Sequence, residues 1–205
     1  MDERTLAAYD GDPEKYCRDW LAQPSPEEIY GSVRRYFRPG GASADIGSGC
    51  GREVDWLNRN GYPCTGYEPS AGLRAQAKRL FPQHTFHSES LPALAGIADA
   101  SFDNVLCETV LMHLPQQEHA AALEGLLRTL RPDGVLRLSW KRGNDGQNRD
   151  PAGRLYENVD IESLLTELPA EVQEANAVKG ASGALIQHVI LQKKRKNLYF
   201  PRILT

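Results

Sequence analysis

Residues 44–51 read ADIGSGCG, in which an aspartate near the end of a short apolar run is followed by three alternating glycines. A strand that carries a carboxylate into a turn without side chains lets a ligand approach the backbone closely. A second apolar run, residues 64–68, ends on Glu68. If the two runs are successive parallel strands, Asp45 and Glu68 lie at one sheet edge. There they suit a ligand with an amine at one end and a ribose diol at the other.

The glycine spacing distinguishes this turn from a dinucleotide site. Nicotinamide and flavin sites need glycines at the first, third and sixth places, so that a pyrophosphate can sit on a helix N-terminus. The sixth place here is Arg52, which opposes a nicotinamide or nucleotide-sugar enzyme. The pattern Gly-x-Gly-x-Gly, with Asp45 two residues ahead, resembles the first motif of the class I S-adenosylmethionine-dependent methyltransferases. This resemblance implies S-adenosyl-L-methionine as the cofactor.

Strand-like and helix-like segments alternate from about residue 25 to the end of the chain. This pattern is typical of a doubly wound α/β fold, with helices on both faces of a sheet. Helix starts are predicted at the capping residues Ser25, Ser70 and Asp160. Strands are predicted up to Asp45 and Glu68, near 85–86, and over 101–108, 135–140, 172–178 and 185–192.

The resemblance to the methyltransferase family covers nearly the whole chain. Besides the glycine turn and Glu68, it rests on residues 102–136, with the segments HLP at 113–115 and RPDGVL at 131–136. These are similar to the small soluble bacterial "methyltransferase domain" group, which implies a Rossmann-like, seven-stranded, mostly parallel sheet with an antiparallel last strand. It also implies an N-terminal helical lid over residues 1–40, a cofactor-binding domain over 41–196 and a C-terminal tail over 197–205.

Size and composition fit one globular domain of 205 residues with a formal net charge of −3. The charged residues are spread along the chain, so charge gives no support for a nucleic-acid partner. The cysteines at 17, 50, 64 and 107 form no Cys-x-x-Cys pair, which predicts reduced intracellular thiols. The N-terminus is acidic and has no apolar run behind it, so neither a signal peptide nor a membrane span is expected. The predicted location is the cytoplasm.

The glycine turn and Glu68 are assigned to the two ends of the cofactor. Asp45 can accept from the ammonium group, and unencumbered N–H groups around Gly47, Ser48 and Gly49 can meet the carboxylate, with Gly51 completing the turn. Glu68 can accept two hydrogen bonds from the ribose hydroxyls. The alternative for Asp45 is a strand-end residue that hydrogen-bonds to its own turn. The alternative for Glu68 is a solvated loop residue.

The adenine end departs from the family pattern. Family members usually carry an aspartate where this chain has His87, so the base is assigned to Ser88 or Glu89, with Leu91 as an apolar contact. Near the sulfonium, Cys107 and Glu108 are expected to form the floor of the site.

Other site residues lie on segments around this core. In the N-terminal segment, Tyr16 is a candidate contact for the methionine carboxylate, and its alternative is packing within an amphipathic helix. His113 is a tentative general base, and its alternative is a hydrogen-bonded histidine that supports its loop. The histidine and cysteine spacing predicts no metal site. A polar loop carries Lys141, Arg149, Arg154 and Tyr156, which suit an acceptor with a carboxylate or phosphate.

The sequence therefore predicts an enzyme that transfers a methyl group from S-adenosylmethionine, by in-line displacement, to a small and possibly anionic molecule. The alternative is a non-catalytic methyltransferase-like binding module or a domain of a larger assembly. An apolar tail after residue 197 suggests a homodimer contact or a downstream domain. The acceptor, the methylated atom and the oligomeric state are not defined by these motifs.

Overall fold

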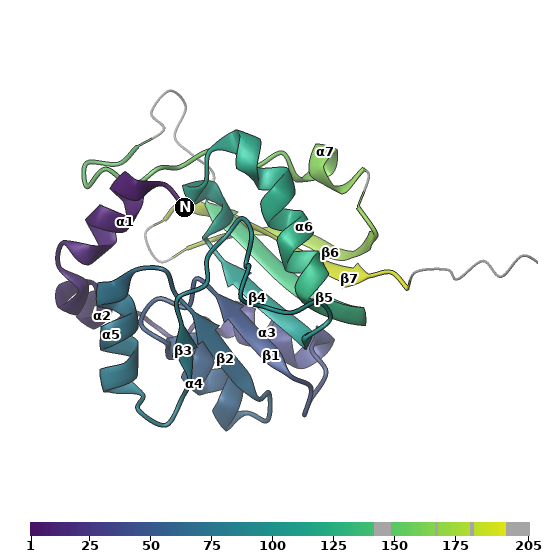
Figure 1. The fold of residues 1–205 in the computed structure, drawn as a ribbon, viewed down its shortest axis with the longest axis horizontal. Coiled ribbons are helices and arrows are strands. Elements are labelled where there is room, and N and C mark those ends of the chain that lie inside the picture. The colour runs from purple at the N-terminus through teal and green to yellow at the C-terminus, as the bar shows by residue number, and fades with distance from the viewer. Residues whose placement is uncertain (142–148, 167, 181–182, 196–205) are drawn as a thin grey trace, which may run out of the picture.

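A computed structural model describes residues 1–141, 149–166, 168–180 and 183–195. Its seven strands form one sheet in the order β3-β2-β1-β4-β5-β7-β6, and β7 is antiparallel to both of its neighbours (Figure 1). The doubly wound α/β fold with an antiparallel last strand is therefore confirmed. The strands are β1 (Ser43–Ile46), β2 (Cys64–Tyr67), β3 (Phe86–His87), β4 (Phe102–Glu108), β5 (Leu130–Lys141), β6 (Ala170–Lys179) and β7 (Leu185–Lys193).

Each strand divides its side chains between two separate apolar layers, because successive residues point to opposite faces. One layer joins Ala44 and Val105 of the sheet to α6 (His119–Thr129) and to partly buried residues of α7 (Ile161–Leu165). The other joins Leu106 and Ile190 to α3 (Glu27–Tyr36), α4 (Arg52–Arg59) and α5 (Ala71–Leu80). Helices cover both faces of the sheet, as Figure 1 shows.

Two short helices at the N-terminus, α1 (Glu3–Asp10) and α2 (Pro13–Leu21), pack against α5 beside the sheet. Asp10 links them to the start of α5, since its Oδ1 accepts from the Ser70 hydroxyl at 2.6 Å and from Gly72 N at 2.8 Å. Helix α3, which lies within the predicted lid, instead packs Val33 and Phe37 into the layer under the sheet. The predicted tail over 197–205 lies outside the described residues.

The prediction that all four cysteines are reduced thiols is wrong for one pair. Cys17 on α2 and Cys50 in the glycine turn form a disulfide, with their Cα atoms 5.5 Å apart. Their separation of 33 residues gave no local sign of pairing, and it is the docking of α2 against the turn that brings them together. Cys64 and Cys107 are free and buried.

Two element boundaries also differ from the prediction. Ser25 does not cap α3: Pro26 occupies the cap position, and the Ser25 hydroxyl donates to Glu27 Oε1 at 2.8 Å. Strand β5 begins at Leu130 rather than at 135, because Leu130 pairs with Phe102 ahead of an irregularity in the β4–β5 ladder. Ser70 and Asp160 cap their helices as predicted.

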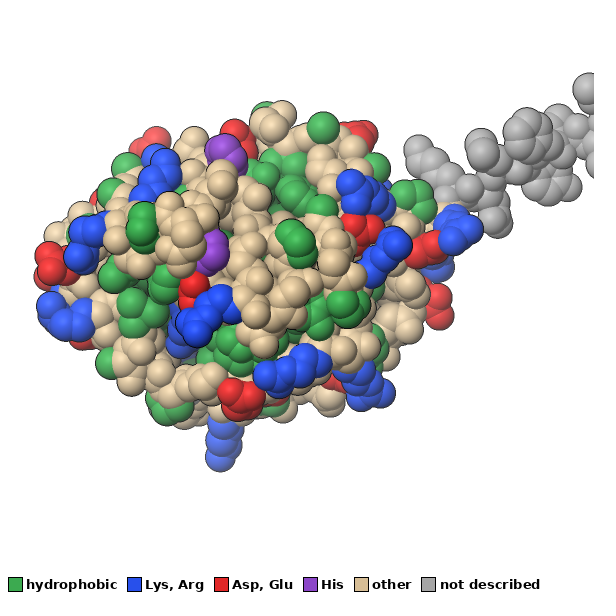
Figure 2. All heavy atoms as spheres, turned by 90° about the horizontal axis from the view of Figure 1, so that it is seen from below, with side chains coloured by type: hydrophobic (Ala, Val, Ile, Leu, Met, Phe, Trp, Pro, Cys, Tyr) green, Lys and Arg blue, Asp and Glu red, His purple; other side chains and the backbone are tan. Residues whose placement is uncertain are grey.

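The surface shows basic and acidic side chains interspersed on the face drawn in Figure 2. None of the helices in the described part of the chain is long and apolar enough to cross a bilayer.

Candidate active site

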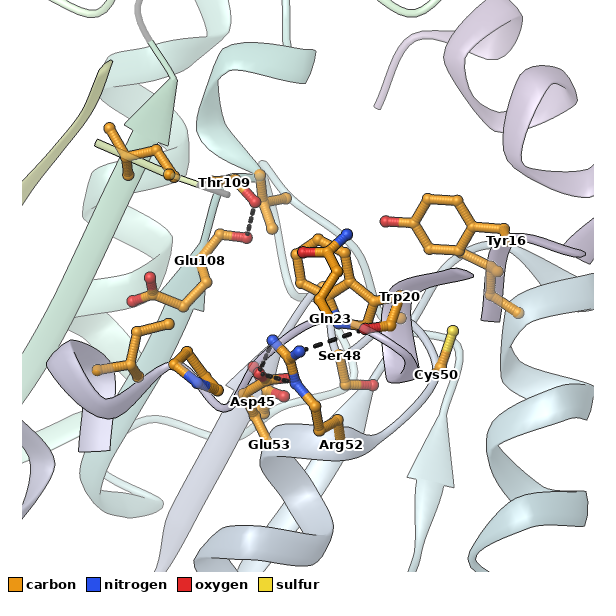
Figure 3. Close-up of a pocket in the computed structure, with 18 of the residues that line it drawn as sticks. Tyr16, Trp20, Gln23, Asp45, Ser48, Cys50, Arg52, Glu53, Glu108 and Thr109 are labelled. Carbon is orange, nitrogen blue, oxygen red and sulfur yellow. Dashed lines mark hydrogen bonds and ion pairs between the residues drawn. The ribbon is translucent and has the colours of Figure 1, made fainter. Parts of the chain in front are cut away.

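A cavity of about 420 Å³ opens at the carboxyl ends of β1, β2 and β4. Its volume is in the range typical of small-molecule sites. The glycine turn and the strand ends line one side, and residues from α2, the start of α3 and the β6–β7 end line the others (Figure 3). Asp45 and Glu68 both line this cavity, so the two carboxylates share one hollow.

Asp45 presents a buried carboxylate to the cavity. Its side chain belongs to a residue that is only 3% exposed, and within the described residues no group donates a hydrogen bond to it. Burial, followed by the nearby carboxylates of Glu53, Glu108 and Glu68, raises its pKa well above the usual value. A buried carboxylate without a partner is costly, and an ammonium group would supply the missing donor and counter-charge.

The glycine turn is shaped by close packing. Gly47 has φ +79°, and a Cβ at this position would collide with the side chain of Val110. Gly51 has φ +85°, and a Cβ there would lie 2.7 Å from the ring of Phe86. Among the residues that the structure describes, the buried hydroxyl of Ser48 on the cavity wall has no hydrogen-bond partner. An orphaned hydroxyl of this kind fits a polar ligand atom.

The prediction that N–H groups of this turn are free for a carboxylate is wrong. Gly47 N and Ser48 N both donate to the carbonyl of Tyr67, at 2.7 and 3.1 Å, and Gly49 N donates to Glu68 Oε2 at 2.8 Å. The parallel pairing of β1 with β2 continues past Asp45 into the turn and uses these donors. The cavity offers side-chain hydroxyls in their place: that of Ser48, and that of Tyr16, which points into the cavity from α2 (Figure 3).

Glu68 joins the ends of β1 and β2. Besides the bond from Gly49, its Oε1 accepts from Ser70 N at 2.8 Å. Burial raises its pKa to about 7, although the two backbone donors oppose this shift. Each oxygen keeps one lone pair, so a diol could still donate to both.

The residues assigned to adenine lie outside the cavity lining. Leu91 is 1% exposed and packs in the core around α6, while the carboxylate of Glu89 accepts from Gly96 N at 3.1 Å. Ser88 is exposed. Instead, Met1 lines the cavity, and its amino group donates to Leu91 O at 3.1 Å.

At the end of β4, the side chains of Cys107 and Glu108 point to opposite faces of the sheet, because successive strand residues alternate. Cys107 faces the apolar core, is fully buried and does not line the cavity, and burial raises its thiol pKa well above the usual value. Glu108 lines the cavity from the opposite sheet face. Its Oε1 accepts from the Arg137 guanidinium and its Oε2 accepts from the Ser139 hydroxyl at 2.7 Å.

His113 lines the cavity, but both ring nitrogens have partners. Nδ1 lies 2.5 Å from Leu155 O and Nε2 lies 2.9 Å from the Tyr9 hydroxyl. With Nδ1 as the donor, Nε2 accepts from Tyr9. Burial lowers the pKa of His113 to about 4. The histidine is therefore neutral near pH 7, and Tyr9 covers the nitrogen that would accept a proton.

The four loop residues assigned to an anionic acceptor do not line this cavity. Arg149 forms a bidentate ion pair with Asp2, in which each of its two terminal nitrogens donates to one carboxylate oxygen at 2.8 Å. Arg154 Nε donates to Asp150 Oδ2 at 2.7 Å. Lys141 lies over the ring of Tyr156, 5.2 Å from its centroid. Arg154 lines a separate hollow on the far side of Tyr9 and Tyr16. Asp2, the partner of Arg149, was not identified from the sequence because it lies on a distant segment, whereas Asp150 is four residues from Arg154 in the same loop.

The comparisons with known proteins agree with this site. Residues 44–138, which include the glycine turn, Glu68 and Glu108, match the family described as "Methyltransferase domain". This segment of the chain carries a methyltransferase domain. The family uses S-adenosylmethionine as its methyl donor, as the glycine motif implied. A comparison with curated proteins gave no match.

Solved structures share the fold of this chain. A Burkholderia thailandensis 1,6-didemethyltoxoflavin-N1-methyltransferase, solved with 1,6-didemethyltoxoflavin and S-adenosylhomocysteine bound, is 19% identical, covers 94% of this chain and 88% of its own, and has a TM-score of 0.74. A Methanosarcina mazei S-adenosylmethionine-dependent methyltransferase is 18% identical over 85% of this chain and 100% of its own, with a TM-score of 0.65. The cyclase SpnF is 16% identical over 83% and 81%, with a TM-score of 0.66. At these identities the likeness shows the fold alone.

Sequence reasoning missed several residues of the methyltransferase cavity. Arg52 and Glu53 follow the glycine turn directly, and their side chains pair at 2.7 Å on the cavity wall. Their position in the first helical turn after the glycine motif could have identified them as cavity residues. Trp20, which lies 4.7 Å from the Arg52 guanidinium, and Glu28 come from distant segments and gave no such signal.

Proposed function

We propose that this protein transfers the methyl group of S-adenosylmethionine to a small-molecule acceptor by in-line displacement. The observation that supports this most is the convergence of an unpartnered Asp45 carboxylate, an unpartnered Ser48 hydroxyl and Glu68 on one cavity beside the glycine turn. These are the groups that an ammonium, a carboxylate and a ribose diol require.

In this proposal each cofactor group has a named contact. Asp45 accepts from the ammonium, the Ser48 and Tyr16 hydroxyls donate to the carboxylate, and the free lone pairs of Glu68 accept from the ribose. When bound, S-adenosylmethionine supplies a methyl group already activated by a positive sulfur. An acceptor lone pair would form the new bond to the methyl carbon, and the electrons of the broken carbon–sulfur bond would remain on sulfur.

The chain's contribution is mainly alignment and exclusion of water. Tyr9, Tyr16 and Trp20 of α1 and α2 form one wall of the cavity, and Arg52 ties Trp20 to the turn through a bond to its carbonyl at 3.4 Å. His113 is held neutral behind Tyr9 and is proposed to position this wall. If a proton must leave the acceptor, we propose that it passes to Glu108, whose carboxylate lines the cavity at the end of β4.

Isothermal titration with S-adenosylmethionine and S-adenosylhomocysteine tests the proposal. The wild-type protein is expected to bind both, and Asp45→Asn is expected to weaken binding by roughly 10- to 100-fold, as for loss of a charge-assisted hydrogen bond. Glu124→Gln, an exposed change on α6, is the matched control and should bind like the wild type. Absence of heat with both ligands in folded protein overturns the proposal.

A second candidate is a protein of this fold that binds the cofactor without transferring methyl groups. The similarity to a cyclase shows that the fold alone does not fix the reaction. A screen for radiolabelled methyl transfer to metabolite, peptide and RNA pools separates the two. Label in a product supports transfer, and cofactor binding with no label in any pool supports the second candidate.

A further inference from the structure

The cavity wall is acidic. Its lining contains the six carboxylates of Glu27, Glu28, Asp45, Glu53, Glu68 and Glu108, and the two basic side chains of Arg52 and Lys179, besides the N-terminal residue Met1. On the proposed function, Asp45 and Glu68 serve the cofactor, and Arg52 already pairs with Glu53. The carboxylates left beside the space for the acceptor are those of Glu27, Glu28 and Glu108.

A buried arginine holds two of these carboxylates in place. Arg137, which is 1% exposed, donates to Glu108 Oε1 through one nitrogen and to Glu28 Oε2, at 2.6 Å, through another. It reaches them because β5 alternates, so that Arg137 and Ser139 point to the α3 face while Leu136 and Leu138 enter the opposite layer. One guanidinium therefore fixes both carboxylates at the cavity wall, and the other oxygen of Glu28 lies 3.4 Å from His188 Nε2.

Apolar side chains form a large part of the cavity wall. They are those of Trp20, Pro26, Ile29, Val110 and Ile186. Such a wall suits a flat or branched hydrocarbon body. Beside these two carboxylates, which share one guanidinium, an anionic group would meet like charge at short range, whereas a cation would meet preorganised acceptors.

We propose that the acceptor is an organic cation, an apolar body that bears an ammonium group, and that Glu108 and Glu28 are the residues that select for it. The proposal rests on the methyltransferase function proposed above and narrows its substrate class. Arg137 is a positioning residue, which orients both carboxylates without contacting the acceptor. The basic side chains that could have favoured an anion, Arg149 and Arg154, are paired with Asp2 and Asp150 outside this cavity.

Matched pairs of small probes test the charge preference directly. Phenethylamine and 3-phenylpropionate, or tryptamine and indole-3-propionate, share an apolar body and differ in the sign of the terminal charge. Each is titrated into protein saturated with S-adenosylhomocysteine. The amine of each pair is expected to bind at least about tenfold more tightly than the acid. In the variant Glu28→Gln/Glu108→Gln that ratio is expected to fall to about twofold or less.

Glu28→Gln alone keeps the test interpretable if Glu108→Gln disturbs folding, because the Glu28 side chain is 38% exposed at the start of α3. It is expected to lower the ratio about threefold, and Glu124→Gln is expected to leave it unchanged. Equal binding within each pair, preference for the acid, or binding of neither member overturns the inference. So does a Glu108→Gln protein that keeps the amine preference but loses affinity for S-adenosylmethionine relative to S-adenosylhomocysteine, since Glu108 would then serve the sulfonium. If S-adenosylhomocysteine itself does not bind, the proposed function fails first.

Discussion

The two ends of the cavity are built differently. The cofactor end comes from residues close in sequence, the glycine turn over 47–51 with Asp45 and Glu68 on neighbouring strand tips. Helix α2 adds Tyr16 to this end, whereas the acceptor end comes from the start of α3, the end of β4 and the β6–β7 end. The first keeps unpartnered polar atoms for a ligand, whereas the second holds its carboxylates in a network around Arg137. The contrast indicates that cofactor binding is a local property and acceptor choice a tertiary one.

The largest effect is expected from breaking the network at the acceptor end. Arg137→Met leaves Glu108 and Glu28 without their shared cation, and removal of one partner from a buried pair costs about 3–5 kcal/mol. We expect the free energy of unfolding in urea to fall by this amount. Adding Glu108→Gln to Arg137→Met should recover part of the loss. An unchanged unfolding midpoint for Arg137→Met would contradict a stabilising role for the ion pairs of Arg137 with Glu108 and Glu28.

The next effect concerns the covalent link between α2 and the cofactor end. The Cys17–Cys50 disulfide closes a loop with a separation of 33 residues, for which chain-entropy arguments give about 3–4 kcal/mol. Cys17→Ser should lower the free energy of unfolding by about this amount. Dithiothreitol should destabilise the wild type similarly and should have no further effect on Cys17→Ser, which serves as the internal control. A wild type that is insensitive to reductant would contradict the link.

A smaller effect, of about tenfold in affinity, follows from the raised pKa of Glu68. In the free protein this carboxyl titrates at about 7 instead of its usual 4.5. The folded protein therefore binds the proton more tightly than the unfolded chain, so this group's contribution to stability falls as the pH rises from 4.5 to about 7. A ribose diol prefers the ionised form, so affinity for S-adenosylhomocysteine should rise about tenfold between pH 6 and pH 8. Asp45, whose pKa is also raised by burial, adds to the same trend.

Glu68→Gln separates these contributions. The variant should bind more weakly at pH 8 and show a shallower pH dependence, measured by the same titrations in buffers of equal ionic strength. If wild type and variant had parallel pH profiles, Glu68 would not be the group that titrates.

The smallest effect is expected in the loop first assigned to an anionic acceptor. Arg154 pairs with Asp150 and is separated from the cavity by Tyr9 and Tyr16. For Arg154→Gln we expect less than about threefold change in affinity for S-adenosylhomocysteine or phenethylamine, and about 1 kcal/mol or less in stability, as for a partly exposed ion pair. A tenfold loss of acceptor binding would place this arginine at the acceptor after all and would weaken the contrast between the two ends.

Much of the fold could be predicted from the sequence because its signals are short-range. The β4 strand and the last two strands were predicted within a few residues, since alternation and flanking turns report on each strand separately. Ser70 and Asp160 identified their helix starts for the same reason. The start of β5 was missed because pairing with Phe102 extends it through a Pro-Asp-Gly segment that is typical of a turn.

The candidate site could be predicted only in part. Asp45, Ser48, Glu68, Tyr16, Glu108 and His113 do line one cavity, whereas Ser88, Glu89, Leu91 and Cys107 do not. The error at Cys107 is one of strand register, because a neighbouring residue on a strand faces the other side. The error at the turn was to count N–H groups as free when the β1–β2 pairing used them.

The sequence by itself determined the order of strands and helices, the glycine turn and the placement of Asp45 and Glu68 at adjacent strand ends. Periodicity, capping and turn chemistry act over a few residues, so a single chain segment carries all the information they need. Only the tertiary structure decided the Cys17–Cys50 link, the pairing of Arg149 with Asp2, and the ion pairs of Arg137 with Glu28 and Glu108. These contacts join segments that are distant in sequence, and their geometry exists only once the sheet and its helices have packed.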